Sequence, residues 1–207
     1  MSLGIFCLIK GRRSVRKYSL REVPMDILFR VLEAARWAPS AHNAQPWRFI
    51  VITDRSLKRK LAERMADEWV KDMIGDGVPR DTREKLAEAS IKRFTDAPIL
   101  IVACVTMEDM DTYPDRRRMR CEYVMAVQSL AASIQNILLA AYSEGLGSCW
   151  FCAPLFCQDA VRKVLRIPES VEPQALITLG YPSEKPAPPP RKSLREIVYV
   201  NHWGEEV

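Results

Sequence analysis

The stretch Ala38-Pro39-Ser40-Ala41-His42-Asn43-Ala44-Gln45-Pro46-Trp47-Arg48-Phe49 lies between an amphipathic helical pattern and an apolar run with β character. Its two prolines disfavour helix, because proline lacks an N–H donor and favours extended geometry in the residue before it. Ser40, Asn43 and Gln45 therefore stand in a rigid loop, and their hydroxyl and amide groups suit a polar ligand. Taken alone, the pattern is more typical of a well-capped connector between a helix and a strand.

Upstream of this loop, the segment Arg12-Arg13-Ser14-Val15-Arg16-Lys17-Tyr18 concentrates cationic side chains. Guanidinium groups bind phosphate bidentately, so these arginines form a candidate phosphate site, which Arg191 would join from the far end of the chain. A solvated basic patch is the alternative, and the residues alone do not exclude it. Neither GxGxxG nor GxxxxGK[ST] occurs, so neither a Rossmann nor a P-loop nucleotide site is indicated.

The composition is that of an ordinary globular chain, with 48% apolar and 28% charged residues among 207. This length predicts a single domain over residues 1–207 with a sizeable core. The formal charge of +5 is mild and its basic residues are interspersed with acidic ones, so we expect no nucleic-acid partner. No apolar run reaches the ~18 residues of a membrane span and no signal peptide is recognisable, which predicts a cytoplasmic protein without membrane contact.

The six cysteines form no clear disulfide or metal pattern. Cys149 and Cys152 are spaced as C-x-x-C, but they lie inside an apolar, aromatic run rather than at the start of a helix. Zinc would need a second cysteine pair or nearby histidines, and His42 and His202 are far apart in sequence. We therefore predict buried, reduced thiols and no metal site, with a redox role for Cys149 and Cys152 as the less favoured alternative.

Hydrophobic periodicity predicts an alternation of helices and strands. The longest helix is predicted from Arg120 to Glu144 and ends at Gly145, in the manner of a C-terminal glycine cap. The β-rich run Ile99–Val105 is typical of a central strand buried on both faces. The remaining predicted helices cover Pro24–Trp37, the segment after Asp54, Asp81–Phe94 and Phe156–Leu165, and the remaining predicted strands cover Arg48–Thr53, Leu146–Phe151 and Ala175–Gly180.

Two further segments extend this α+β framework. The segment Trp69–Phe94 is predicted to be a helical excursion over a site, and a solvated helical hairpin is an equally good alternative. The segment Pro182–Pro190 is rich in proline and should be extended. Residues 182–207 are therefore expected to form a C-terminal arm that follows some surface.

Six motifs occur in the same order as in the nitroreductase-like FMN flavoproteins, and the chain resembles that family over most of its length. The segment Arg12–Tyr18 resembles the family's RRSxRxY/F motif, and Ala38–Phe49 resembles APSxxNxQPWRF. The other four matching segments are Ala97–Val105, Gly145–Trp150, Leu179–Pro182 and Pro190–Leu194.

The resemblance implies an α+β fold with a mixed central β-sheet flanked by helices, assembled as an intertwined homodimer with FMN at its interface. It also implies an oxidoreductase in which NADH or NADPH reduces FMN and a small organic acceptor, such as a nitroaromatic or a quinone, reoxidises it in a ping-pong cycle. Because the cofactor carries the reactivity, no catalytic residue is predicted. Arg13 is expected to stabilise negative charge on the reduced ring.

The resemblance also assigns site residues, position by position. The phosphate- and ring-binding motif is matched by Arg12, Arg13, Ser14 and Arg16, and the C-terminal phosphate arginine by Arg191. Ser40 and Asn43 match positions that reach the flavin from the partner subunit. Phe151, Cys152 and Ala153 match the strand end near the ring, although many relatives have glycine where Cys152 stands. Gln45 and Trp47 are interpreted as loop bracing and core.

Alternatives remain open within this resemblance. The iodotyrosine deiodinase, flavin destructase and F420-linked FMN-domain branches all share motifs with the chain, and the sequence does not choose among their activities. The preference between NADH and NADPH is equally open. A protein that binds or stores FMN without turnover is the alternative from another functional class.

Overall fold

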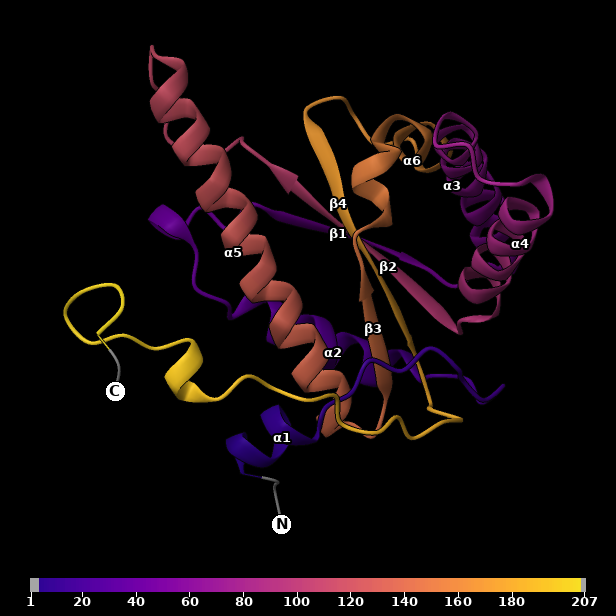
Figure 1. Ribbon diagram of the computed structural model, residues 1–207, viewed down its shortest axis with the longest axis horizontal. Coiled ribbons are helices and arrows are strands. Elements are labelled where there is room, and N and C mark those ends of the chain that lie inside the picture. The colour runs from indigo at the N-terminus through magenta and orange to yellow at the C-terminus, as the bar shows by residue number, and fades with distance from the viewer. Residues whose placement is uncertain (1–3, 206–207) are drawn as a thin grey trace.

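The computed structural model describes residues 4–205, and a four-stranded sheet in the order β1-β2-β4-β3 lies at its centre (Figure 1). Its strands are β1 (Trp47–Ile52), β2 (Ile99–Thr106), β3 (Gly147–Phe151) and β4 (Val171–Gly180). All pairings between these strands are antiparallel. Among the described residues, parallel pairing is confined to an isolated bridge between Ser14 and Ser148. The α+β class is confirmed, and the predicted mixed character of the sheet rests on that one bridge.

The residues of strand β2 show why a hydrophobic core lies against each face of the sheet. All of its residues are buried, and alternate side chains point to opposite faces because a strand has a period of two. Ile101 and Ala103 pack with α2 (Met25–Arg36) and α5 (Arg116–Ser143), whereas Leu100 and Val102 pack with the helices of the other face. The predicted central strand, buried on both sides, is therefore confirmed.

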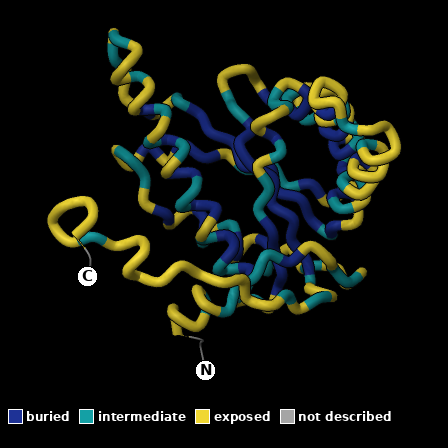
Figure 2. Tube along the Cα trace, viewed as in Figure 1, coloured by how far each residue is buried: buried dark blue, intermediate teal, exposed yellow. Residues whose placement is uncertain are grey.

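The second face of the sheet is covered by three further helices, α3 (Arg55–Gly75), α4 (Arg80–Asp96) and α6 (Gln158–Leu165) (Figure 1). Figure 2 shows the sheet and the inner sides of both helical layers as the buried part of the chain. The short α1 (Ile5–Gly11) has no buried residue. Three 3₁₀ turns complete the elements of the described residues: η1 (Ala41–Asn43), η2 (Ala153–Phe156) and η3 (Leu194–Glu196).

Local capping explains where the helices begin and end. The Asp54 carboxylate accepts a hydrogen bond of 2.6 Å from the Leu57 N–H and so starts α3, the helix predicted after Asp54. Asp115 does the same for the Arg118 N–H at 3.0 Å, so α5 begins at Arg116 rather than at the predicted Arg120. Gly145, with φ of +76°, ends α5 in the left-handed region that glycine tolerates best.

Helix α5 is long and apolar enough, by length and composition, to cross a membrane. This differs from the sequence analysis, which found no stretch of sufficient length. In the fold, 44% of that apolar stretch is buried. Its apolar residues, such as Leu130 and Ile137, lie in the core between α2 and the sheet, so we interpret α5 as a core helix.

The segment Trp69–Phe94 forms the outer part of a hairpin between α3 and α4. The roots of this hairpin belong to the core, because Leu61 and Phe94 pack against β2 and β4. Residues 182–205 form an extended, largely exposed arm that leaves the sheet after β4, passes Arg16 and ends apart from the body (Figure 1). The last two residues of the predicted arm lie outside the described part of the chain.

Candidate functional site

The arginine segment is fixed along the outer strand β3. The Val15 N–H donates to the Ser148 carbonyl at 3.0 Å, and a Cβ at Gly147 would lie only 2.8 Å from the Val15 side chain. The Tyr18 hydroxyl donates to the Val15 carbonyl at 2.6 Å and lies 2.6 Å from Thr178 Oγ1 on β4. Burial raises the pKa of Tyr18, so its proton stays in place and the anchor is permanent. The segment is therefore held at a defined position on the sheet.

A cavity of about 320 Å³ opens between this segment and the C-terminal arm. It is lined by Arg12, Arg13, Ser14, Arg16 and Arg191 together with prolines of the arm. The five predicted phosphate-site residues, almost 180 positions apart at their extremes, thus meet at one place. Within residues 4–205, none of these arginines forms an ion pair with a carboxylate. Clustered cations without acidic partners favour an anionic ligand.

Glu184 attaches the arm to the arginine segment. Its carboxylate accepts hydrogen bonds from the backbone N–H groups of Arg16 at 2.7 Å and Lys17 at 3.2 Å. The Ser183 N–H donates to the Lys17 carbonyl at 3.0 Å. These bonds fix the root of the arm and place Arg191 over the cavity. Glu184 could not be identified from the sequence, because no local pattern indicates a contact between residues so far apart in the chain.

Two further cavities share lining residues in series with the arginine cavity, and we call the three cavities together the groove. Arg16 also lines a neighbouring cavity of about 650 Å³, which Arg93 of α4 shares. Arg93 in turn lines a further cavity of about 470 Å³, and its guanidinium lies 5.8 Å from the centre of the Phe151 ring. Arg93 therefore lies between the basic end of the groove and its aromatic end. Arg93 was not among the site residues predicted from the sequence.

The hairpin of α3 and α4 covers the aromatic end of the groove. Phe151 and Ala153 line it from the sheet side, and Trp69 and Phe94 line it from the hairpin. Two of the three predicted ring-binding residues thus face an apolar cavity. Cys152, which lies between them in sequence, is exposed at the start of η2.

Ser40 and Asn43 lie elsewhere in the same chain. The loop that carries them leads into β1, whereas the arginine segment pairs with β3, and β1 and β3 are the opposite edges of the sheet. Through the strand register, Trp47 and Ser148 are separated by about 14 Å across the sheet and about 20 Å along it. The structure therefore brings the arginines together but leaves Ser40 and Asn43 remote from them within one chain.

The loop itself is tightly braced. The Ser40 hydroxyl accepts a hydrogen bond of 3.1 Å from the Gln45 N–H, and the Ala41 N–H donates to Ser129 Oγ of α5 at 3.2 Å. His42, Asn43 and Gln45 all have positive φ, a conformation that costs non-glycine residues roughly 1–3 kcal/mol each. Trp47 is buried in the core, as predicted.

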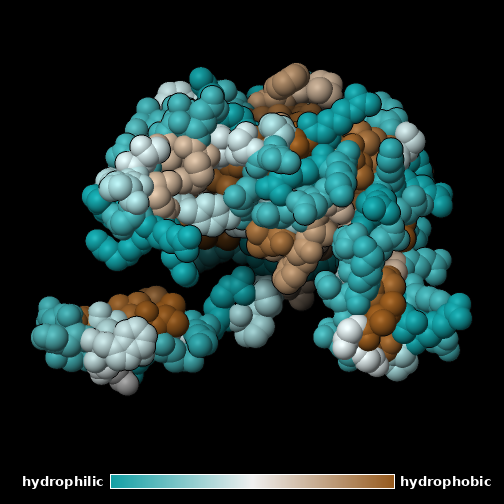
Figure 3. All heavy atoms as spheres, turned by 90° about the horizontal axis from the view of Figure 1, so that it is seen from above, coloured by the Kyte–Doolittle hydropathy of each residue, from teal (hydrophilic) through white to brown (hydrophobic). Residues whose placement is uncertain are grey.

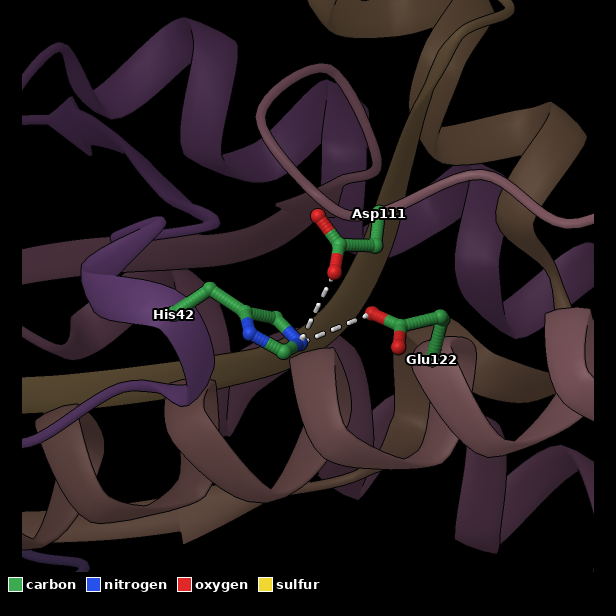
Figure 4. A group of neighbouring side chains, drawn as sticks. All are labelled: His42, Asp111 and Glu122. Atoms are coloured by element: carbon green, nitrogen blue, oxygen red, sulfur yellow. Dashed lines mark ion pairs between the residues drawn. The ribbon is translucent and has the colours of Figure 1, made fainter.

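His42 belongs to a side-chain cluster that the sequence analysis did not foresee. Its Nε2 lies 3.4 Å from Glu122 Oε2 and 3.8 Å from Asp111 Oδ2 (Figure 4). The prediction of no metal site considered only cysteines and histidines. It overlooked carboxylates that come close to His42 only through the tertiary fold, so these three side chains form a candidate metal-binding group.

The cysteines are all unpaired, and their burial differs from the expectation. Cys104 and Cys149 are buried as predicted, and Cys157 is half-buried. Cys7, Cys121 and Cys152 are exposed, so the prediction of burial was wrong for these three. Burial raises the pKa of the Cys149 thiol, which keeps it protonated and unreactive near neutral pH.

Comparisons with known proteins show the family to which the chain belongs. Residues 9–181 match the model of the nitroreductase family. A protein of Methanothermobacter thermautotrophicus named as an NADH dehydrogenase/NAD(P)H nitroreductase is 35% identical over 86% of this chain and 77% of its own. The crystal structure of a BluB-like flavoprotein from Clostridium difficile 630 superposes with a TM-score of 0.78 at 25% identity, covering 95% of this chain and 98% of that one.

A third similar structure is described with its ligands. It is iodotyrosine deiodinase bound to FMN and 3-iodo-L-tyrosine, with a TM-score of 0.74 and 25% identity over 96% of this chain and 99% of that one.

Proposed function

Because the chain belongs to the nitroreductase family, we propose that it is an FMN-dependent oxidoreductase which uses NADH or NADPH to reduce a small organic acceptor, such as a nitroaromatic or a quinone. When bound, FMN supplies the hydride chemistry, accepting hydride from the nicotinamide and passing electrons to the acceptor in a ping-pong cycle. The chain's own residues bind FMN and orient it and the acceptor.

The arginine cavity is the main observation in support of this proposal. Its four guanidinium groups, together with Ser14, fit the phosphate of FMN, which would supply the anionic partner that these arginines lack among the described residues. Each charge-assisted hydrogen bond to the phosphate contributes about 1.5–3 kcal/mol. The groove through Arg93 then leads to the cavity at Phe151, whose apolar walls suit a planar ring.

We further propose a homodimer in which Ser40 and Asn43 complete the partner's flavin site. The position of these residues at the far edge of the sheet supports this, because one chain does not bring them to its own arginines. The exposed apolar side chains of the arm support it as well. Figure 3 shows the end of the arm apart from the body, and Ile197, Val200 and Trp203 are all exposed there. Apolar surface of this kind suits burial against a second copy.

A second candidate function is the reductive dehalogenation of an aromatic amino acid. The similar structure with 3-iodo-L-tyrosine suggests it, and the lining of the aromatic cavity supports it. Trp69 and Phe151 offer faces for a ring, while Arg93 and Asp72 offer opposite charges for the carboxylate and ammonium of an amino acid.

Anaerobic titration tests the proposed function directly. The purified protein should be yellow, bleach with NADH or NADPH and recolour when a nitroaromatic, a quinone or a halotyrosine is added. The acceptor that recolours it fastest identifies the reaction. A yellow protein that neither nicotinamide bleaches would instead be a flavin-binding module without turnover, and a protein unable to take up FMN would contradict both.

We also propose a cytoplasmic location. The six unpaired cysteines support it, because thiols persist in reducing compartments.

The thiols should be dispensable for the reaction. Replacing Cys149 and Cys152 together by serine should leave FMN bound and most activity intact. Stability should fall by about 1–3 kcal/mol, because a hydroxyl replaces the buried Cys149 thiol. The single Cys152→Ser variant, changed at an exposed position, is the matched control and should keep wild-type stability. Flavin content, turnover and thermal denaturation measure these outcomes, and loss of turnover with FMN still bound would show a redox role.

A further inference from the structure

His42, Asp111 and Glu122 converge from three separate elements. His42 lies in η1, Asp111 in the loop after β2, and Glu122 in the second turn of α5. Figure 4 shows all three side chains pointing towards one another. One potential ligand atom from each lies within 4.8 Å of the other two. A nitrogen and two carboxylate oxygens are thereby gathered at a single point.

The buried carboxylate of Glu122 is the observation that points to a ligand. Its side chain is only 3% exposed, and its Oε2 has no hydrogen-bond partner within residues 4–205. Glu122 continues the buried stripe of α5 that includes Ala126 and Ser129, so the helix cannot turn the carboxylate to water. A buried carboxylate oxygen without a hydrogen bond is costly, and Glu122 Oε2 is aimed at His42.

The distances suit a small divalent ion. Bonds of about 2.0–2.2 Å to nitrogen and oxygen place neighbouring tetrahedral ligands about 3.3–3.6 Å apart. The separation of 3.4 Å between His42 Nε2 and Glu122 Oε2 already falls in this range. Asp111 Oδ2 is 3.8 Å from His42 Nε2, and its exposed side chain can rotate inward. His42 and Asp111 are partly open to solvent, so water can occupy the remaining position.

We propose that His42, Asp111 and Glu122 bind a divalent transition-metal ion of the Zn²⁺ class. An imidazole with two carboxylates suits Zn²⁺ and its neighbours in the first transition row, whereas Mg²⁺ and Ca²⁺ favour oxygen ligands alone. The ion neutralises both carboxylates and takes the place of the hydrogen bond that Glu122 Oε2 lacks. It also ties the loop Ala38–Phe49 to α5, in addition to the hydrogen bond from Ala41 to Ser129.

Calorimetry with ZnCl₂ tests the proposal on the full chain as purified. The protein is first treated with a chelator and desalted, and exposed thiols are blocked with N-ethylmaleimide in every sample, so that cysteines do not compete for zinc. Wild type should show one tight site per chain. The His42→Asn and Asp111→Asn substitutions should each weaken that site at least tenfold. Asparagine suits position 42, because it tolerates the positive φ found there.

His202→Gln provides the matched control. His202 Nδ1 lies 3.0 Å from Glu205 Oε1 in the exposed arm, an imidazole–carboxylate pair without a buried third ligand. This substitution should leave zinc affinity unchanged. Glu122→Gln tests the buried ligand directly. Because Glu122 is buried, the folding of this variant is checked by circular dichroism. Asp111→Asn, changed at an exposed loop, keeps the test decisive if Glu122→Gln does not fold.

Anomalous diffraction at the zinc edge provides a second measurement. A peak between the three side chains supports the site. Wild-type binding no tighter than that of His42→Asn, or a peak elsewhere, would overturn it and leave a plain His42–Glu122 ion pair. Neither measurement uses turnover, so the outcome is independent of the proposed oxidoreductase activity.

Discussion

Replacing Arg16 and Arg191 together by alanine should weaken FMN binding about 10²–10⁴-fold while leaving the fold intact. Both guanidinium groups line the cavity between the arginine segment and the arm, and each is expected to supply one charge-assisted contact to the phosphate. A contact of this kind is worth about 1.5–3 kcal/mol, so each single variant should lose about 10–100-fold. Because both side chains are exposed, their removal leaves no cavity in the core.

The choice of these two arginines follows from their surroundings. Arg13 donates to the carbonyls of Lys10 and Arg12 at 2.7 and 2.8 Å, so its loss would also disturb the end of α1. Among the described residues, the guanidinium groups of Arg16 and Arg191 donate hydrogen bonds only to backbone oxygens, at 3.1–3.4 Å. Their removal therefore reports on the ligand rather than on the fold.

Flavin fluorescence quenching with apoprotein gives the affinities. Arg195→Ala is the matched control, because it removes the same charge from an exposed position on the same arm, outside this cavity. It should bind FMN as wild type does, and all variants should show the wild-type far-UV spectrum. If the double variant binds FMN as tightly as Arg195→Ala, the phosphate does not occupy the arginine cavity.

The strands and helices could largely be predicted because their signals are local. The apolar run Ile99–Val105 is typical of a strand buried on both faces, and β2 occupies it. The glycine at the end of the long helical pattern likewise marked the end of α5. The antiparallel order of the sheet could not be predicted, because a strand buried on both faces has the same pattern in either direction.

The candidate site could be predicted from local sequence only where its residues are contiguous. Arg12, Arg13, Ser14 and Arg16 form one segment, and the resemblance added Arg191 from a second motif. Arg93, Glu184 and the cluster around His42 had no such signal, because their partners come close only through the packing of α4, the arm and α5. Cys152 was misjudged for a related reason, since an apolar neighbourhood in sequence does not fix which side of the strand end meets solvent.

The proposed homodimer leads to a prediction that separates a shared flavin site from a site within one chain. Arg16→Ala and Asn43→Ala homodimers should each carry a defect in both sites, because a two-fold axis repeats every change. A heterodimer with Arg16→Ala in one chain and Asn43→Ala in the other behaves differently. If Asn43 serves the partner's site, both defects fall in one site and the second site is wild type. This heterodimer should then bind about one tight FMN per dimer and retain about half of the wild-type activity.

The reciprocal heterodimer is the control for this experiment. It pairs a wild-type chain with a chain that carries both Arg16→Ala and Asn43→Ala, so the composition of substitutions is identical. In a shared site each flavin then meets one defect, and no tight site remains. Co-expression with two affinity tags isolates both heterodimers, and flavin content per dimer distinguishes them. The distance between β1 and β3 predicts that the split arrangement keeps the tight site. If the double-substituted chain with a wild-type partner keeps it instead, each flavin is held within one chain, and Ser40 and Asn43 play no part in the partner's site.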